Sequence, residues 1–455
     1  MQVKIIMMQT RIGAFMRPEW YPLLSQPLPR YACYPTARAF SDVIGASEFA
    51  DALAAMPTYA TLALNLNIPF CRQLCHHCTC NGEALHDPGR AKRYIQTLIH
   101  EIRMVADRTG LLHPITSVHF GGGNPISLDV GDVGRILDSI EQVFGLTDRA
   151  EISMEVDPRF VCYDNICEFG ALGLSRVNLG VQDFDPDVQR AIGRVQPHAQ
   201  VAAMVEGLRS CGIFDIGFDL VCGLPHQTSA GFEKTLDETI ALEPSRISVL
   251  DYGHLPKSLR NQVHGPELSL PSLKSRYELF DLAREMLVHA GYFQIGFDLF
   301  ARPEDKLTVA ARCGTLKRNF QGFSADPAQY SIGLGVSAVS ELGELLTKNT
   351  NSLSLYEDVI ASDNLATAGG IRKTGEDALR ATIIEQLLCF LEVDLLSLCN
   401  SAQIDLGQFT QAFEDLRELQ KLGILTLQDG TVEISDEARA LSPVVASSFD
   451  TACPS

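Results

Sequence analysis

The sequence predicts an α/β protein: a partial (β/α) barrel with an N-terminal arm and a C-terminal, mainly helical, winged-helix-like domain. Two observations predict the barrel. Short apolar runs alternate with amphipathic helical stretches, and Gly, Pro or polar residues follow nearly every run. A third observation predicts the last domain, because from about residue 375 the pattern changes to helix, helix and hairpin.

We expect three units in the 455 residues: an arm over 1–55, the barrel over 56–345 and the C-terminal domain over 346–455. The first fifty residues are rich in Pro and aromatic residues, which is typical of an extended arm with turns. Its first apolar patches are broken by Lys4 and Arg11, so we expect no secretion signal.

Seven runs rich in Val, Ile and Phe are predicted to be buried parallel strands. They are residues 62–68, 117–123, 151–158, 176–182, 215–225, 246–256 and 294–303. Motifs such as GGGNP, EVDP, GLP and FARP follow them. One or two such motifs would indicate only turns, but their repetition favours a shared active-site face at the carboxyl ends of the strands.

Helices are predicted between these strands, because apolar residues recur at helical spacing on one face. The two clearest sets are Ile95, Leu98, Ile102, Val105 and Val133, Ile136, Ile140, Val143. In the last domain we expect one helix over 377–398, a second over 409–423, and a hairpin around Asp429-Gly430. This domain carries no basic patch, so we interpret it as a lid or packing domain.

Composition excludes two classes of partner. The charge sum, 37 Lys+Arg against 56 Asp+Glu, is −19, which disfavours attraction to a nucleic-acid backbone. No run of 18 apolar residues occurs, so we expect no membrane span. The protein is expected to be a cytoplasmic monomer.

Thirteen cysteines, an odd number, indicate a reducing compartment rather than a disulfide framework. Nine are scattered and are expected to be structural thiols. The other four, Cys71, Cys75, Cys78 and Cys80, fall within ten residues directly after the first predicted strand.

The spacing Cys71-x3-Cys75-x2-Cys78 places soft thiolates on one loop, and such ligands select zinc, copper(I) or iron–sulfur clusters. If three cysteines hold a [4Fe–4S] cluster, one iron stays open to bind a substrate through nitrogen and oxygen. Cys80 would instead close a four-cysteine zinc site. The spacing favours the cluster, and both alternatives stay open at this point.

These motifs together resemble the radical SAM (S-adenosylmethionine) superfamily and, within it, the oxygen-independent coproporphyrinogen III oxidases. The resemblance runs from about residue 26 to 340 and continues more weakly beyond. Its stretches include RYACYPTARAF, NIPFCRQLCHHCTC, HFGGGNP, EISMEVDPR, NLGVQDFDPDVQRAIGR, FDLVCGLPHQT, DYGHLP, GFDLFARPEDKL, LKRNFQGFSAD and GLGVSAVS.

The resemblance implies a partial TIM-type radical SAM barrel with a [4Fe–4S] cluster held by Cys71, Cys75 and Cys78. It implies one bound SAM, or two. The implied SAM contacts are Gly122, Gly123, Glu155, Gln182, Arg194, Asp219 and Val339. Phe320, Gln321 and the non-ligating Cys80 are implied to lie near the substrate.

The implied activity is that of an oxidoreductase of haem biosynthesis. It converts two propionates of coproporphyrinogen III to vinyl groups, giving protoporphyrinogen IX, with an electron donor such as flavodoxin or ferredoxin. Because the substrate carries four carboxylates, an acidic protein needs a locally basic cavity. We expect Arg302, Arg312, Lys317 and Arg318 to supply that charge.

The sequence departs from the family pattern near the cofactors. Asn65 and Asn67 replace an aromatic residue and a histidine, Asn124 replaces threonine, and Leu299 replaces a second histidine. A second hypothesis is therefore a paralogue with altered or lost turnover, such as a haem- or porphyrin-binding protein or a radical SAM enzyme with another substrate. A third is a zinc-stabilised barrel of unrelated function.

Overall fold

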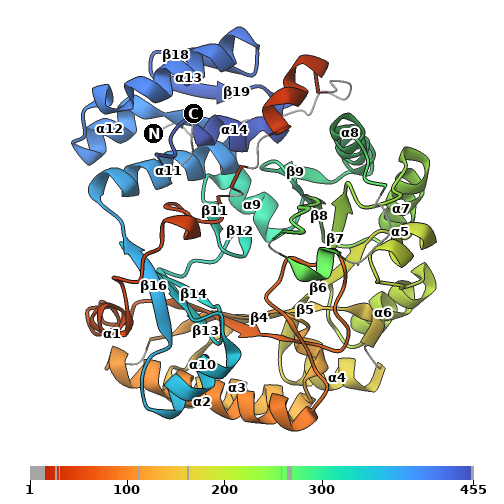
Figure 1. Ribbon diagram of the computed structural model, residues 1–455, viewed down its shortest axis with the longest axis vertical. Helices are drawn as coiled ribbons and strands as arrows, with labels where there is room; N and C mark the ends of the chain where they lie inside the picture. Colours follow the sequence, from red (N-terminus) through yellow and green to blue (C-terminus); the bar gives the residue numbers. More distant parts are fainter. Residues whose placement is uncertain are drawn as a thin grey trace.

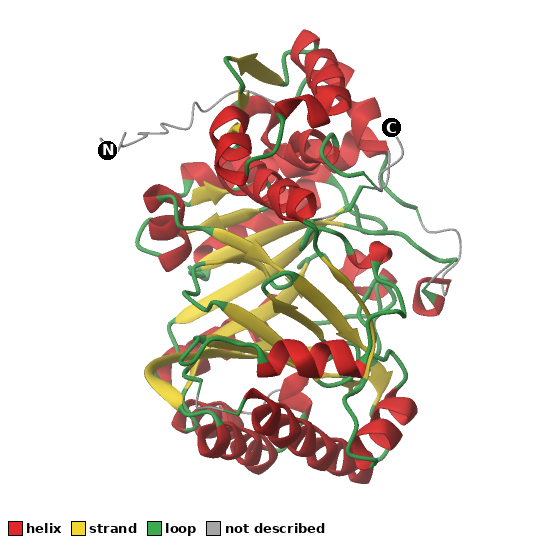
Figure 2. Cartoon of the chain, turned by 90° about the vertical axis from the view of Figure 1, so that its left-hand side faces the viewer, coloured by secondary structure: helices red, strands yellow, loops and turns green. Residues whose placement is uncertain are grey.

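The structure, a computed structural model, describes residues 16–25, 28–29, 31–110, 113–160, 163–257, 259–263 and 269–451. Lys4 and Arg11, in the first part of the predicted arm, lie outside these residues. One twelve-stranded sheet curves into an incomplete barrel, with helices along its outside and a helical domain packed at one end (Figures 1 and 2).

Seven adjacent strands of this sheet are parallel, and they confirm six of the seven predicted strands. In sheet order they are β13 (Tyr330–Leu334), β1 (Leu62–Ile68), β4 (Ile115–Gly122), β5 (Leu146–Val156), β6 (Leu174–Gln182), β7 (Asp215–Cys222) and β8 (Arg246–Asp251). Their carboxyl ends therefore meet at one end of the barrel.

The prediction of a parallel strand over 294–303 is wrong. This segment folds as an antiparallel hairpin of β9 (Phe293–Ile295) and β10 (Leu299–Ala301), and β10 runs antiparallel to β8. The chain reverses at Gly296, whose φ of 54° suits glycine and whose missing side chain leaves room for Phe323 and the Leu388 carbonyl.

Three antiparallel strands extend the sheet at its other edge: β14 (Val339–Leu342), β15 (Leu345–Asn349) and β16 (Thr367–Arg372). The edges formed by β16 and β9 do not pair, so the barrel stays open. The division of the chain at residues 55 and 345 stays a prediction.

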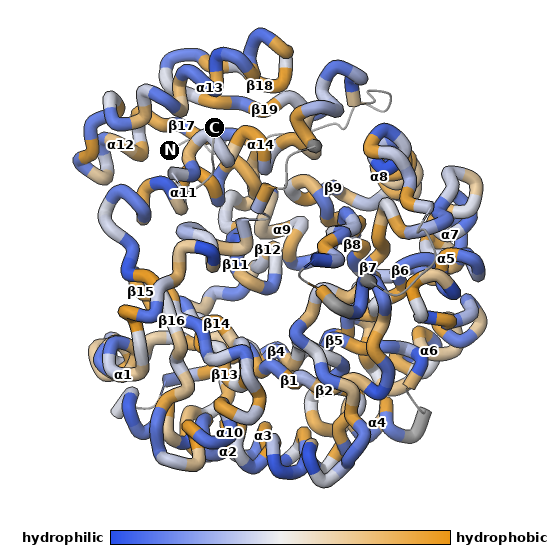
Figure 3. Tube along the Cα trace, viewed as in Figure 1, coloured by the Kyte–Doolittle hydropathy of each residue, from blue (hydrophilic) through white to orange (hydrophobic). Residues whose placement is uncertain are grey.

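Helices cover the outer face of the sheet. They are α1 (Ala46–Ala54), α2 (Pro88–Thr109), α3 (Val130–Val143), α4 (Tyr163–Ala171), α5 (Pro186–Ala191), α6 (His198–Ser210), α7 (Ser229–Ala241), α8 (Leu273–His289) and α10 (Leu353–Ala361). A further helix, α9 (Lys306–Cys313), packs instead against β9, β10 and α11. Ile95, Leu98, Ile102 and Val105 on α2 are fully buried, as predicted. The alternating colours along α2 and α3 in Figure 3 show the same amphipathic pattern.

The C-terminal domain has its own hydrophobic core. It contains α11 (Gly375–Phe390), α12 (Leu395–Ala402), α13 (Thr410–Lys421) and α14 (Ser442–Ser447), with a small sheet of β17 (Glu392–Asp394), β18 (Leu425–Gln428) and β19 (Thr431–Ile434). The hairpin at Asp429-Gly430 is confirmed. The single helix over 377–398 is wrong, because Leu391 turns left-handed (φ 61°) and the next residues pair with β19.

Two of the nine scattered cysteines are not free thiols. Cys167 on α4 and Cys211 after α6 form a disulfide, with Cα atoms 5.1 Å apart. The sequence could not indicate this pair, because 44 residues separate its members.

Candidate active site

The four clustered cysteines lie on the loop that follows β1, at the carboxyl end of the parallel strands. Cys71 ends the short strand β2 (Phe70–Cys71), which pairs with β3 (Glu83–Ala84). A distant segment fixes the loop: the Asn261 amide donates to the carbonyls of Cys75 (3.1 Å) and Cys78 (2.7 Å). Two backbone carbonyls of the cysteine loop are therefore held by a side chain from outside the loop.

The glycine-rich end of β4 presses against this loop. The Gly123 amide donates to the Ile68 carbonyl at 2.7 Å. Gly122 has φ of 102°, and a side chain there would overlap the Asn67 amide. The glycines thus allow a close approach of β4 to the strand that carries the cysteines.

Cys75 is buried between two arginines. Its Sγ accepts hydrogen bonds from Arg159 Nη2 (3.2 Å) and Arg194 Nη1 (3.5 Å). Asp157 binds both guanidinium groups, at 2.7 and 2.9 Å. Burial raises the pKa of Asp157, but hydrogen bonds from Arg159 and the charge of Arg194 outweigh it and hold this pKa below its usual value.

The other thiols interact with one another. Burial, and then the charges of Cys78 and Cys75, raise the pKa of Cys71 to about 12. The Cys80 thiol donates to Cys78 and lowers the pKa of Cys78 to about 7, while the same contact and burial raise the pKa of Cys80. Of these three thiols, Cys78 is therefore the one whose ionised form is favoured.

Polar side chains project into the barrel below this loop. Glu155, near the end of β5, accepts from the Gly122 amide at 3.3 Å and lies 3.7 Å from His119 Nε2. His119 also bonds Ser153 at 2.8 Å. Asn178 on β6 donates to Asp219 on β7 at 2.5 Å. These groups offer acceptors and donors to a polar ligand.

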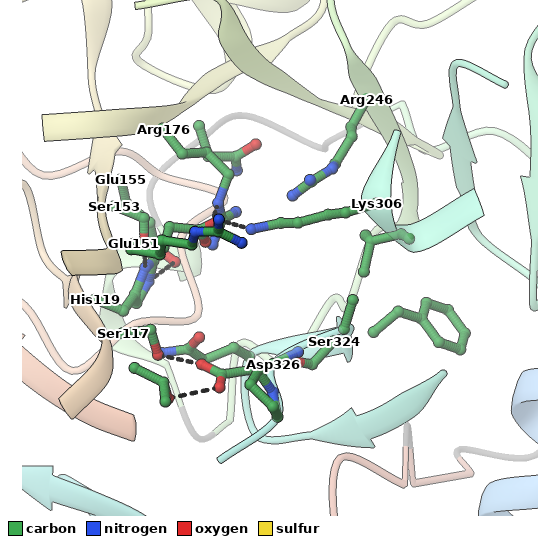
Figure 4. A pocket seen from close by; sticks show the side chains of 18 residues that line it. Ser117, His119, Glu151, Ser153, Glu155, Arg176, Arg246, Lys306, Ser324 and Asp326 are labelled. Carbon is green, nitrogen blue, oxygen red and sulfur yellow. Dashed lines mark hydrogen bonds and ion pairs between the residues drawn. The ribbon is translucent and has the colours of Figure 1, made fainter. Parts of the chain in front are cut away.

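A cavity of about 260 Å³ occupies the barrel interior (Figure 4). Arg176, Arg246 and Lys306 point toward it, and Glu151 lies between Arg176 and Lys306. Arg176 binds Glu151 at 2.8 Å, and Arg246 binds Asp305 at 2.7 Å. Burial, and then the charge of Arg246, lower the pKa of Arg176 to about 10.

Comparison with known proteins identifies the family. The profile of the radical SAM superfamily matches residues 68–239. An oxygen-independent coproporphyrinogen III oxidase of Bradyrhizobium diazoefficiens is 37% identical over 93% of this chain and 94% of its own. One from Pseudomonas aeruginosa is 34% identical over 94% of both chains. The solved coproporphyrinogen III oxidase of Escherichia coli, a radical SAM enzyme, aligns with a TM-score of 0.88 and 32% identity, over 94% of this chain and 100% of that chain.

The chain belongs to the oxygen-independent coproporphyrinogen III oxidase family. As a radical SAM oxidoreductase of this family it uses a [4Fe–4S] cluster and SAM. The partial barrel predicted from the sequence is confirmed.

The cysteine loop fits the cluster that the family uses. Its thiols lie close enough for their charges to interact, and N–H donors meet Cys75 and Cys78. Because the family uses a [4Fe–4S] cluster, the comparisons support the cluster and give no support to a four-cysteine zinc site.

The structure brings together many of the residues that the sequence singled out. Gly122 contacts Glu155, and Arg194 contacts Cys75. Gln182 lies at the end of β6, where its amide nitrogen lies near Gly180. Cys80, Phe320 and Val339 line a second cavity of about 350 Å³.

The asparagines that depart from the family pattern make hydrogen bonds within the fold. The Gln321 amide donates to Asn65 Oδ1, and the Asn67 amide donates to the Val336 carbonyl. Asn124 accepts from the Asp157 amide at 3.0 Å. All three asparagines that depart from the family pattern are therefore engaged in the fold.

The four residues expected to supply positive charge do not line the barrel cavity, and their role toward the substrate stays a prediction. Arg302 lies at the amino end of the barrel, because its strand runs antiparallel and its amide bonds Ser245 just before β8. Arg312 and Arg318 stack on Phe293 and Phe297, and Lys317 bonds the Ala328 carbonyl. The cations that line the barrel cavity are instead Arg149, Arg176, Arg246 and Lys306.

Sequence reasoning also missed Asp157, Arg159 and Asn261. Asp157 and Arg159 stand in the EVDPR stretch next to Glu155, and that nearness was the one available signal. Nothing local marks Asn261, whose partner Cys78 is 183 residues away. None of the helices in the described ranges is long and apolar enough to cross a membrane.

Proposed function

We propose that this chain catalyses the oxygen-independent conversion of coproporphyrinogen III to protoporphyrinogen IX in haem biosynthesis. Each of two propionates loses one hydrogen atom, one electron and CO₂, and becomes a vinyl group. The observation that carries the proposal is the full-length match to the Escherichia coli enzyme, combined with a cysteine loop suited to a cluster.

We propose Cys71, Cys75 and Cys78 as the cluster ligands. When bound, the cluster and SAM supply the one-electron chemistry that removes hydrogen from the propionate. The chain itself positions these groups: Asn261 and the β4 glycines fix the loop, and Arg194 donates to Cys75.

SAM is proposed to bind above the barrel interior. Support comes from the grouping of polar and glycine residues there: the backbone amides after β4, the Glu155 carboxylate and the carboxylate of Asp219 face one region. The full proposed set is Gly122, Gly123, Glu155, Gln182, Arg194, Asp219 and Val339.

The substrate is proposed to lie beside the two cavities, near Phe320, Gln321 and Cys80. A one-electron donor of the flavodoxin or ferredoxin type completes the reaction. We propose a cytoplasmic monomer without nucleic-acid or membrane partners, in line with the net charge of −19.

The test is an anaerobic assay of the reconstituted full chain with SAM, a reductant and coproporphyrinogen III. We expect vinyl products and consumption of SAM that depends on the porphyrinogen. An Asn65→Tyr/Asn67→His double variant, assayed beside it, shows how far these positions set the rate. A loaded protein that binds haem stoichiometrically but forms no vinyl product would contradict the proposal.

A further inference from the structure

The Cys75 sulfur differs from the other proposed ligands in the groups that donate hydrogen bonds to it. Among the described residues, it alone receives hydrogen bonds from guanidinium groups, those of Arg159 (3.2 Å) and Arg194 (3.5 Å). Cys78 receives a bond from the Cys80 amide. The family resemblance assigns Arg194 to SAM, whereas Arg159 has had no role so far.

Arg159 is fixed on every side. Its Nε and Nη2 bind the Asp157 carboxylate, and its Nη1 donates to the Gly193 carbonyl at 3.2 Å. The guanidinium also lies 4.9 Å from the Phe160 ring. Its side chain is only 7% exposed. These contacts hold the side chain in place, so that Nη2 points at the Cys75 sulfur before a cluster binds.

Such a contact has a defined electronic consequence. Reduction adds one negative charge to a cluster, and hydrogen bonds to its sulfur ligands tune the potential at which this happens. A buried cation next to a ligand sulfur stabilises the reduced state more than an exposed one, because water screens it less. Asp157 places an opposite charge against the same guanidinium.

We propose that Arg159 is a positioning residue that raises the reduction potential of the cluster bound through Cys75, and that Asp157 opposes this effect. The proposal rests on the cluster ligands given under the proposed function. It predicts opposite signs for neighbouring substitutions, which a purely structural role of the two residues does not.

The experiment measures the midpoint potential of the reconstituted full chain by a redox titration followed by electron paramagnetic resonance, in the absence of SAM. For Arg159→Gln we expect the equilibrium constant for reduction to fall about tenfold, which is about 59 mV more negative for a one-electron couple. For Asp157→Asn we expect a shift to more positive potential. Iron and sulfide contents confirm loading beforehand.

Arg209→Gln is the matched control, because Arg209 binds the carbonyls of Leu242 and Glu243, away from the cysteine loop. If Arg159→Gln does not load, Arg159→Lys decides, with a smaller shift of the same sign expected. Shifts no larger than that of Arg209→Gln, or equal signs for the Arg159 and Asp157 variants, overturn the proposal. A wild-type chain that binds no cluster overturns the proposed ligand set instead.

Discussion

At the scale of single residues, Cys80 distinguishes the two hypotheses for the cysteine loop, a cluster site with three cysteine ligands and a zinc site with four. Its backbone amide donates to Cys78 Sγ at 3.3 Å, and its thiol bonds the same sulfur. Cys80 also lines the second cavity with Phe320 and Val339. These contacts are in line with the prediction that Cys80 supports Cys78 and is not a fourth ligand.

Substituting each of the two cysteines tests which of them is a cluster ligand. Cys78→Ser is expected to lose most cluster iron, because it removes a proposed ligand, whereas Cys80→Ser is expected to keep about four irons per chain. Iron and sulfide analysis after anaerobic reconstitution measures both. Equal loss of iron in the two variants would contradict this assignment.

Residue patterns could single out the cysteine loop because the spacing of its cysteines is local. The partners of those cysteines could not be predicted in the same way. Arg159 is 84 residues from Cys75 and Asn261 is 186 residues from it, and only folding brings them together. The cations that line the barrel cavity were not singled out for a related reason: each cation was judged by its place in the sequence, and the strand before Arg302 runs the opposite way.

At the scale of elements, α2 is joined to the β13–β14 connection by a buried carboxylate. Glu101 accepts from the Gly335 amide (2.6 Å), Asn349 (2.7 Å) and Tyr356 (2.7 Å). Tyr94, about two turns earlier on the helix, donates to the Asn67 carbonyl at 2.5 Å. The helix thus holds the segment that leads to Val339.

This network gives the fold a pH dependence. Burial raises the pKa of Glu101 from 4.5 to about 7, against the opposing effect of its hydrogen bonds. Since the folded state holds the proton more tightly, the contribution of Glu101 to stability is full below pH 4.5 and is lost as pH rises to about 7. The loss is of order 3 kcal/mol, at about 1.4 kcal/mol for each pH unit.

We therefore expect the free energy of unfolding to fall more between pH 5 and pH 8 in the wild type than in Glu101→Gln. Urea denaturation at both pH values measures it. Glu414→Gln, on the exposed face of α13, is the control and should behave as the wild type. Identical pH dependence in all three proteins would argue against this role for Glu101.

The disulfide between α4 and the end of α6 predicts a second effect on stability. It closes a loop of 44 residues, for which chain entropy gives about 4 kcal/mol as an upper value. Cys167→Ser is expected to lower the free energy of unfolding by about 2–4 kcal/mol under oxidising conditions. In reducing buffer the variant and the wild type should be equally stable, and a difference that persists there would point to packing instead.

Whether a segment forms a helix or a strand was predictable where its apolar residues follow a clear pattern. The strands that became β1 and β4–β8 each contain several buried apolar residues, and α2 has a regular apolar stripe. Direction was not predictable for β9 and β10. Their apolar residues suit either a parallel strand or a hairpin, and Gly296 favours the hairpin only because Phe323 and α11 lie against it.

At the scale of the whole molecule, the C-terminal domain is joined to the barrel by buried polar contacts as well as apolar ones. Arg439 donates to the Gly296 carbonyl at 3.0 Å and binds Asp436 at 2.9 Å. Arg284 on α8 binds the same carboxylate. Trp20 from the arm is fully buried and donates to the Leu422 carbonyl at 3.0 Å.

Arg439→Ala is expected to destabilise the protein by about 1–3 kcal/mol, because it leaves the buried Gly296 carbonyl without this donor and removes a cation from the partly exposed Asp436. Chemical denaturation measures the change. Lys421→Ala, which breaks an exposed pair with Glu418, should cost less than about 1 kcal/mol. Comparable losses in the two variants would show that the Arg439 contacts add little.

The large sequence separation between Asn261 and the cysteine loop also affects the order in which the site is assembled. During synthesis, the ribosome delivers Cys78 183 residues before the amide that fixes its carbonyl. Arg159 and Arg194 also emerge after the cysteines whose sulfur they contact. The cysteine thiols of a nascent chain are therefore exposed well before the residues that contact the loop have been synthesised. Delivery of iron to the finished barrel, rather than to the growing chain, is the order of assembly that this architecture favours.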